Sequence, residues 1–269
     1  MRSLVGVLLA ALLFISYVPL TVTSKTNALK SEETATAPKE NRPAATAVAP
    51  AKTEKSVAEK LYEEMALAEM IQFEAFEQAL QGYNTLHPRN RDILSIIDFT
   101  LPSTKKRMVV LDMNQHKVLY HTVVAHGRNS GENYAVSFSN KHGSYQSSLG
   151  FYTTDNTYQG GNGYSLVLNG LEKGINDQAK ARAVVIHGAD YVSQSMIKNT
   201  GRLGRSYGCP ALPRELNKPI INTIKNGTLL YIYAKNDAYL AQTKIVNKQP
   251  KTMLAQHDKG TADDLKNLN

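Results

Sequence analysis

One cysteine and one histidine stand out as residues that could do chemistry together. Cys209 is the single cysteine of the 269-residue chain and lies in the glycine- and proline-punctuated stretch 205–210 (RSYGCP). His187 ends the apolar run 183–186 and is followed directly by Gly188, an arrangement in which a buried strand delivers a side chain to the edge of a site. A thiol attacks as the thiolate, and an imidazole can accept its proton and later return it. The pair therefore predicts a cysteine nucleophile with a histidine base.

Both residues also have ordinary structural interpretations. A lone cysteine is commonly a small buried hydrophobe, and a histidine at a strand end can be a hydrogen-bonded structural residue. Residues 1–24 combine a basic start, an apolar run and small residues, which is the pattern of an export signal, either cleaved or kept as an anchor. An exported chain enters compartments where disulfides form, yet Cys209 has no partner. We therefore favour a thiol that is used.

The stretch around Cys209 offers groups that could stabilise negative charge. The backbone amides of Tyr207, Gly208 and Cys209 could converge on the oxygen of a tetrahedral intermediate. Arg205 and Arg202 would raise the local potential, which would lower the thiol pKa or hold a substrate carboxylate.

Three further residues are candidates for the site, and two of them, Ser206 and Tyr152, also have a structural interpretation. Ser206 either hydrogen-bonds the oxyanion or the His187 ring, or is a turn residue that bonds its own backbone. His126 is a candidate second site histidine, since it ends an apolar stretch as His187 does. Tyr152, in an aromatic and polar cluster, either lines a groove for a peptide or sugar or belongs to a strand surface.

A zinc site is the rival constellation. Cys209, His187, His142 and His126 are available, but none has a tight ligand spacing such as C-x-x-C or H-x-x-x-H. The glycine-rich stretch 160–163 predicts a tight loop, because no helical pattern follows it as a nucleotide-binding loop requires. The sequence therefore predicts neither a metal nor a cofactor.

The sequence predicts that short strands joined by glycine-rich loops position Cys209 and His187. Few helices and one apolar face per strand indicate a mainly β domain, either a β-sandwich or a barrel. The hydrophobic pattern predicts a β-hairpin from 108–111 and 118–125, strands at 165–168, 183–186 and 228–233, and a helix over 215–225.

Composition divides the chain into five parts. These are the signal or anchor 1–24, a disordered Ala/Thr/Pro/Lys linker 25–55, an N-terminal helix and connector 56–104, the β domain 105–235 and a polar, loosely packed or disordered tail 236–269. A capping box at Ser56 and Glu59 opens one amphipathic helix over 56–81, which Gly82 ends. Its apolar face could bind a partner, brace the domain behind it or cover a groove; we favour packing on the domain.

The charge distribution points to an acidic partner. The net charge is +8, and the basic excess lies in 105–235 whereas 56–84 is acidic. A positive field fits nucleic acid, an anionic envelope polymer or a lipid surface. Export disfavours nucleic acid, and the basic residues are not interleaved with aromatics as single-strand binders require. The field would attract a carboxylate-bearing substrate and favour the thiolate.

Several stretches together resemble one family. Residues 186–188 (IHG) followed by 206–209 (SYGC) match an H-G…S-x-G-C pattern, which resembles that of L,D-transpeptidases, the YkuD-like enzymes that crosslink bacterial cell walls. The likeness extends to the branch called murein L,D-transpeptidase catalytic domain proteins and covers Leu61 to Tyr233. It is carried by 98–103 (DFTLPS), 125–131 (AHGRNSG), 138–140 (FSN), 147–152 (SSLGFY) and 204–210 (GRSYGCP).

The resemblance implies an L,D-transpeptidase-like β fold and a reaction. Cys209 would be the nucleophile, His187 the general base, and the amides of Gly208 and Cys209 part of the oxyanion hole, with no cofactor. The donor would be a peptidoglycan tetrapeptide stem. The thiolate would attack the carbonyl of the diamino acid before the terminal D-alanine, expel that alanine and form a thioester, which an amine of a neighbouring stem would resolve.

One departure from the family concerns the substrate carboxylate. Many members carry an arginine two residues after the cysteine, where this chain has Ala211. Arg205 or Arg214 is then the candidate to bind that carboxylate.

Two alternative functions remain open at this level. With water as the acceptor, the same acyl-enzyme gives an L,D-carboxypeptidase. A non-catalytic peptidoglycan-binding module is the other alternative, although a degenerate site would be expected to lose Cys209, His187 or one of their glycines. The implied partners are peptidoglycan stem peptides and no nucleic acid. The implied location is the bacterial envelope, in the periplasm, free or tethered to the inner membrane by the N-terminal segment.

Overall fold

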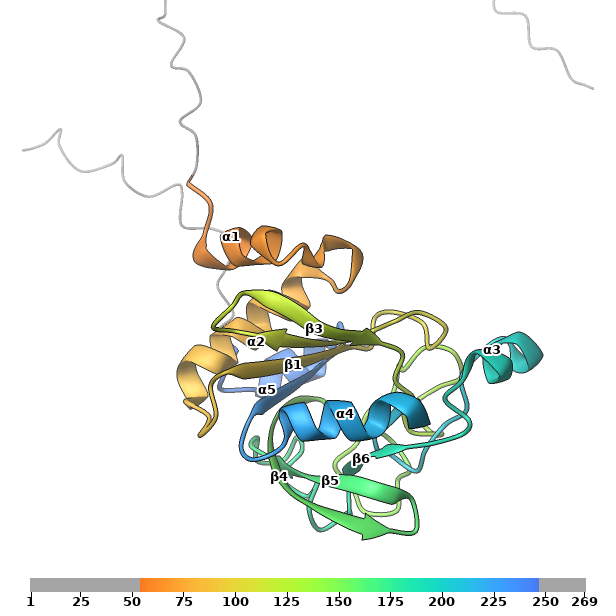
Figure 1. The fold of residues 1–269 in the computed structure, drawn as a ribbon. Coiled ribbons are helices and arrows are strands. Elements are labelled where there is room, and N and C mark those ends of the chain that lie inside the picture. Colours follow the sequence, from red (N-terminus) through yellow and green to blue (C-terminus); the bar gives the residue numbers. More distant parts are fainter. Residues whose placement is uncertain (1–53, 247–269) are drawn as a thin grey trace, which may run out of the picture. The chain divides into compact units, whose positions relative to one another are not determined.

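The computed structural model describes residues 54–246, which form a mainly β domain with short helices (Figure 1). The predicted signal or anchor 1–24, nearly all of the linker 25–55 and residues 247–269 of the predicted tail lie outside the described residues. The strands are β1 Ile93–Asp98, β2 Met108–Asp112, β3 Lys117–Thr122, β4 Gly150–Gly160, β5 Gly163–Gly170, β6 Val185–Gly188, β7 Ala211–Leu212 and β8 Leu229–Tyr233. The helices are α1 Val57–Glu64, the 3-10 turn η1 Leu67–Glu69, α2 Phe73–Leu86, α3 Gln194–Thr200, α4 Arg214–Ile224 and α5 Asp237–Gln242.

The eight strands form one sheet whose two edges meet. Their order is β3-β2-β1-β8-β4-β5-β6-β7, with β1–β8 and β6–β7 parallel and all other neighbours antiparallel. The chain that continues from the edge strand β3 bridges to the other edge at Ala125–Ala211 and Gly127–Ser206. The sheet is therefore a nearly closed barrel. This confirms the predicted mainly β fold and the β2–β3 hairpin, and of the two predicted architectures, β-sandwich and barrel, the structure has the barrel.

A central strand of the sheet, β1, lies before residue 105, where the sequence analysis placed the start of the β domain. β1 lies between β2 and β8, although the sequence analysis placed it in the connector before 105. All six of its residues are buried, as are all five of β8, because α2 packs against both strands and α4 also packs against β1. A strand covered on both faces has no hydrophobic alternation to reveal it. The boundary at 105 therefore cuts through the sheet.

The single predicted helix over 56–81 is wrong, because the chain turns inside it. The capping box of Ser56 and Glu59 opens α1 as expected, but Ala66 adopts a left-handed conformation with φ 52° and the next long helix starts only at Phe73. The carboxylate of Asp98, at the end of β1, accepts the backbone N–H of Gln72 at 2.9 Å. This contact satisfies an amide at the start of α2, where helices lack internal acceptors. The break is thus stabilised by a residue distant in sequence.

Gly82 does not end the second helix, which continues to Leu86. A Cβ at Gly82 would lie 2.1 Å from the Phe151 ring of β4. The glycine is therefore required where α2 lies directly on an aromatic ring of the sheet.

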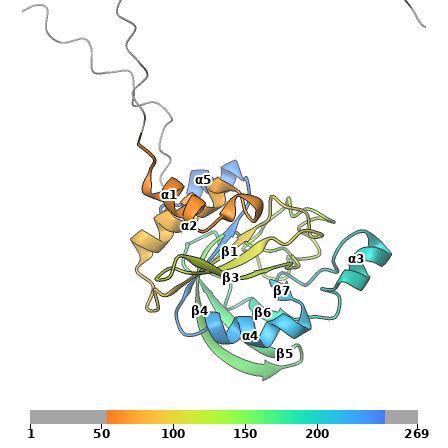
Figure 2. The ribbon, with the colours of Figure 1, turned by 45° about the horizontal axis from the view of Figure 1, so that its top comes forward.

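The predicted polar tail is partly folded. Residues 237–242 form α5, whose Tyr239 is buried. Tyr239 and Thr243 both donate hydroxyl hydrogen bonds to the Glu172 carboxylate, at 3.1 and 2.5 Å. The same carboxylate accepts the Phe151 N–H at 2.9 Å, so Glu172 fastens α5 to strand β4. In both views α5 lies near α2 (Figure 1, Figure 2). Within residues 54–246, no helix combines the length and apolarity needed to cross a bilayer.

Candidate active site

A small apolar cluster, separate from the main core, supports the cysteine loop. Its buried members come from the chain after β3, the chain after β6 and both flanks of the loop: Val123, Ala125, Ala189, Val192, Leu203 and Ala211. The main-chain bonds from Ala125 N to Ala211 O (2.9 Å) and from Ser206 N to His126 O (3.0 Å) hold the loop against the extended chain after β3. Packing and backbone bonds thus fix the loop from both sides.

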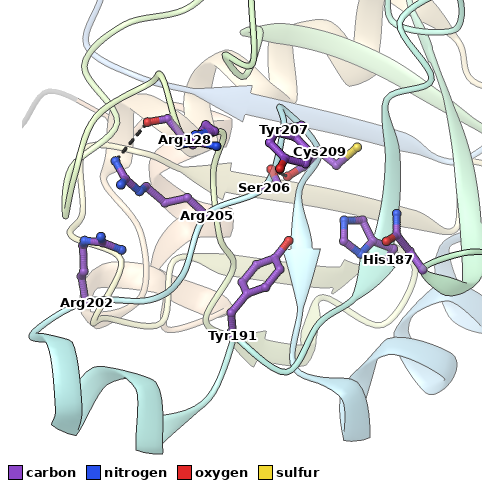
Figure 3. A pocket seen from close by; sticks show the side chains of 9 residues that line it. Arg128, His187, Tyr191, Arg202, Arg205, Ser206, Tyr207 and Cys209 are labelled. Carbon is purple, nitrogen blue, oxygen red and sulfur yellow. Dashed lines mark hydrogen bonds between the residues drawn. The ribbon is translucent and has the colours of Figure 1, made fainter.

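The loop opens on a cavity of about 400 Å³ that contains both sequence-predicted catalytic side chains. It is lined by Arg128, Asn162, His187, Tyr191, Arg202, Arg205, Ser206, Tyr207 and Cys209. Figure 3 shows Cys209 and His187 on the same side of this cavity, with Arg202 and Arg205 on the other. The fold therefore brings together the thiol, the imidazole and the cationic side chains.

The His187 ring is held in a fixed orientation at the end of β6. Its Nδ1 lies 3.1 Å from the Gly188 carbonyl oxygen, so Nδ1 carries the proton and Nε2 keeps its lone pair. Burial lowers the pKa of His187, the Gly188 hydrogen bond raises it and nearby Arg214 lowers it. Gly188 lies where a Cβ would approach Asn217 of α4 to 3.0 Å. Its contribution to the site is the carbonyl that orients the ring.

Cys209 is half-buried and turned toward the chain that leads into β6. Its Sγ accepts the Val185 N–H at 3.4 Å and lies 3.7 Å from the Ala183 carbonyl oxygen, to which the thiol donates. Burial raises the pKa of this thiol, whereas the Val185 N–H and the charge of Arg182 lower it. No hydrogen bond joins Sγ to His187 within the part of the chain that the structure describes. In this structure the thiol therefore contacts the backbone of Ala183 and Val185 instead of the imidazole.

Ser206 behaves as the turn residue that the sequence offered as its second interpretation. Its Oγ donates to the Cys209 carbonyl at 2.6 Å and accepts the Gly208 N–H at 3.1 Å. The Gly208 amide is consequently engaged, contrary to its expected place in an oxyanion hole. The amides of Tyr207 and Cys209 have no protein acceptor among residues 54–246, and these two remain available to a substrate oxygen.

The two arginines proposed for a substrate carboxylate already have acidic partners. Arg205 lies 2.7 Å from Glu132, and it also donates to the backbone carbonyl of Arg128 at 3.0 Å (Figure 3). Arg214 pairs with Asp190 at the surface. Arg202 shares Glu132 at 2.9 Å.

Arg128 differs from these three arginines in having no acidic partner among residues 54–246. It is exposed and lies 5.8 Å from the centre of the Tyr207 ring. Tyr207 in turn contacts Tyr145 with ring centres 4.9 Å apart. An aromatic rim with an unpaired guanidinium thus borders the cavity.

His126 is placed beneath the site and does not face the cavity. Its Nδ1 lies 2.8 Å from the Arg107 guanidinium and its Nε2 lies 3.2 Å from the Gly131 carbonyl oxygen. Arg107 is fully buried and also donates twice to the Val124 carbonyl. Burial, followed by the charge of Arg107, lowers the pKa of His126 to about 4. His126 therefore does not make the expected substrate contact. It is a buried structural residue whose backbone carbonyl accepts the Ser206 N–H.

Replacing His126 with glutamine is expected to flatten the pH dependence of folding stability between pH 6.5 and 4. The neutral ring is favoured in the fold, so its contribution is complete above pH 6.5 and is lost as the pH falls toward 4. A shift from 6.5 to about 4 corresponds to about 3 kcal/mol. Urea unfolding at several pH values measures this pH dependence of the free energy of unfolding. The exposed His142→Gln serves as the control, and an unchanged slope in His126→Gln would contradict the assignment.

Tyr152 and the zinc alternative are not supported by the geometry. The Tyr152 side chain is fully buried, and its hydroxyl bonds Ser148 Oγ at 2.7 Å and does not line the cavity. His142 is exposed, and the His126 ring contacts Arg107 and Gly131. Within the described range no group of three or more His, Cys, Asp or Glu side chains converges on a metal position.

Sequence reasoning missed three cavity residues: Arg128, described above, and two others. Tyr191 follows β6 in an irregular stretch, and Figure 3 shows its hydroxyl pointing into the cavity. Burial and the neighbouring Cys209 raise the pKa of Tyr191 to about 12, so it is a neutral donor. Asn162 occupies the β4–β5 turn, which the sequence identified only as a tight loop. No local pattern marks either residue, although the position of Tyr191 shortly after His187 was a usable hint.

The domain is thus a nearly closed β-barrel with one thiol and one oriented imidazole in a cavity that is also lined by three arginines. The model of the L,D-transpeptidase catalytic domain family matches residues 67–233, more than half of the chain. The chain belongs to this family, as its sequence pattern suggested.

Comparison with solved structures finds distant relatives. An L,D-transpeptidase from Mycobacterium smegmatis is 12% identical with a TM-score of 0.34, over 53% of this chain and 59% of that one. The helical cell shape determining protein Pgp2 (K307A mutant) from Campylobacter jejuni is 15% identical with a TM-score of 0.38, over 60% and 51%. The chain thus spans under two thirds of the length of these relatives. A search of curated proteins finds no match.

Proposed function

We propose that this protein is a peptidoglycan L,D-transpeptidase that works through a Cys209 acyl-enzyme. The observation that carries the proposal is the convergence of the Cys209 thiol and the His187 imidazole on one cavity, with Nδ1 fixed by the Gly188 carbonyl. This arrangement leaves Nε2 as the only ring atom able to accept the thiol proton. Membership of a cell-wall enzyme family supports peptidoglycan as the target and an extracytoplasmic location. Export to the periplasm, free or tethered, remains part of the proposal.

The proposed reaction has two acyl-transfer steps. Binding of the donor stem lets the Cys209 thiol turn from the Ala183 carbonyl toward His187, whose Nε2 takes the proton. The thiolate attacks the carbonyl carbon before the terminal D-alanine, and the amides of Tyr207 and Cys209 receive the oxyanion. The C–N bond then breaks, and His187 returns its proton to the departing D-alanine amine. An acceptor amine attacks the thioester, gives its proton to His187 and releases the thiolate.

Arg128 is the residue proposed to bind a substrate carboxylate in place of the family arginine missing at Ala211. It borders the cavity without an acidic partner among residues 54–246, whereas Arg205 and Arg202 share Glu132. A guanidinium that keeps its donors free can form a bidentate pair with a carboxylate.

Arg128→Gln is expected to raise KM for the donor stem about tenfold with little change in kcat, because the carboxylate contact is made equally in the ground and transition states. Steady-state D-alanine release measures both constants. Lys180→Gln removes an exposed cation that pairs with Asp155 and does not line the cavity, so it is the matched control. A lower kcat at constant KM in Arg128→Gln would speak against this role.

The reaction is tested by incubating the protein with purified tetrapeptide stems and weighing the products and the protein by mass spectrometry. An acyl adduct on the protein, loss of D-alanine and a crosslinked dimer are expected. Loss of D-alanine with only free tripeptide would instead make the protein an L,D-carboxypeptidase. Absence of both adduct and D-alanine would overturn the catalytic proposal and leave the peptidoglycan-binding module.

A further inference from the structure

A half-buried arginine lies beneath the nucleophile and has not entered the mechanism. Arg182 sends its guanidinium into the segment 139–148 and donates to four oxygens there: Ser139 O at 2.7 Å, Gln146 O at 2.6 Å, Ser148 Oγ at 3.3 Å and Ser144 Oγ at 3.4 Å. All four acceptors are neutral. No carboxylate pairs with Arg182 among the described residues, and burial lowers its pKa. Burying a charge on neutral partners costs free energy, which suggests a use for it.

The segment that Arg182 holds is the floor of the cysteine loop. Ser147 Oγ donates to the Gly208 carbonyl at 3.2 Å and accepts the Gly127 N–H at 3.0 Å. Gly208 has φ +125°, and a Cβ there would lie 2.9 Å from Gln146 O and 3.4 Å from Arg182 Nη2. The residue before the nucleophile therefore rests directly on the arginine and on a carbonyl that the arginine binds.

The backbone of Arg182 leads to the other side of the thiol. The next residue, Ala183, has a left-handed φ of 55°, and its carbonyl accepts the Cys209 thiol at 3.7 Å. Val185, at the start of β6, donates to Sγ at 3.4 Å. Arg182 thus links two parts of the site. Its backbone leads into residues 183–185, which contact the sulfur, and its side chain binds segment 139–148, which supports Gly208.

We propose that Arg182 is a positioning residue for Cys209: its guanidinium holds segment 139–148 in place against Gly208, the residue directly before the nucleophile. It acts through the loop and through space, since it does not line the cavity. Arg182 is the one charged side chain that lowers the pKa of Cys209 against the effect of burial, within the described residues. Lys180, two residues earlier, provides a contrast, because it is exposed and lies 3.3 Å from Asp155.

The test uses alkylation of the thiol by iodoacetamide, which reports on Cys209 alone because the chain has one cysteine. In Arg182→Gln, which removes the charge but keeps amide donors, the pH midpoint of alkylation is expected to rise and the rate at pH 7 to fall about tenfold. Arg182→Lys keeps the charge and should retain the parental midpoint. Lys180→Gln is the matched control for loss of one positive charge and should leave the midpoint unchanged.

A structural role alone predicts a different result. It would lower the thermal midpoint of Arg182→Gln but leave the alkylation midpoint at the parental value, and that outcome overturns the proposal. Circular dichroism establishes that the variants are folded. Should Arg182→Gln not fold, Arg182→Lys decides: a lower kcat with unchanged KM and midpoint is expected, whereas a raised midpoint or a kcat equal to the parent's refutes the role.

The inference rests on the proposed role of Cys209 as nucleophile, yet the two can fail separately. Alkylation needs no stem peptide. A raised midpoint in Arg182→Gln together with no D-alanine release by the parent would retain the electrostatic assignment and reject the transpeptidase. Normal D-alanine release by the parent, together with equal alkylation midpoints for the parent and Arg182→Gln, would retain the transpeptidase and reject the role of Arg182.

Discussion

Cys209→Ala is expected to lower D-alanine release from tetrapeptide stems by about 10⁴-fold or more, because it removes the single thiol of the chain, on which the proposed covalent intermediate forms. The acyl adduct seen by mass spectrometry in the parent should be absent. The substitution removes only a sulfur that makes two weak contacts, to Val185 N–H and Ala183 O. Thermal unfolding should therefore stay close to that of the parent.

The design separates loss of chemistry from loss of binding. Cys209→Ala should still retain stem peptides, measured by calorimetric titration, since Arg128 and the aromatic rim are intact. Residual release above the buffer rate, with an acyl group found on another residue, would refute Cys209 as the nucleophile. A parent protein that binds stems as Cys209→Ala does, and releases nothing, would identify a binding module.

His187→Gln is expected to lower kcat at pH 7 by about 10²- to 10⁴-fold, the range for losing a general acid–base group. In the parent the rate should fall as the pH drops through the pKa of His187, which burial holds below 6.5. The sign follows from the role, because only the neutral imidazole can accept the thiol proton. In His187→Gln this acid limb should give way to a rate that climbs at alkaline pH with the thiolate fraction.

A pH profile is the decisive readout for this variant. Glutamine can keep a hydrogen bond to the Gly188 carbonyl, so a simple packing defect would lower the rate equally at every pH. An acid limb that persists unchanged in His187→Gln would assign it to another group. The exposed His142→Gln provides a control that should match the parent throughout.

The sequence predicted which two side chains share the cavity, Cys209 and His187, better than it predicted their surroundings. Cys209 and His187 were identifiable because a unique thiol in a glycine-rich loop and a histidine at the end of an apolar run are local patterns. His126 shows the same strand-end pattern as His187, yet its ring contacts Arg107 and Gly131. Which side of the extended chain faces the cavity depends on how the sheet closes, and no local pattern encodes that.

Arginine roles illustrate the same limit. Arg205 was the natural carboxylate binder from its place in the loop, but Glu132 pairs with it from a distant segment. Arg128 has no acidic partner among residues 54–246. Arg182 gave no signal at all, since its acceptors lie some forty residues earlier in the chain. Pairing of long polar side chains is a property of tertiary neighbours.

The sequence by itself determined the family, the mainly β class and the cysteine–histidine pair, because each depends on residue types at short spacing. The tertiary structure decided where the helices break and which strands are central: Asp98 stabilises the start of α2, and β1 is buried on both faces. It also decided which amides and cations are free around Cys209. These are outcomes of contacts between segments far apart in the chain, where burial and hydrogen-bond competition select one partner among several that the sequence allows.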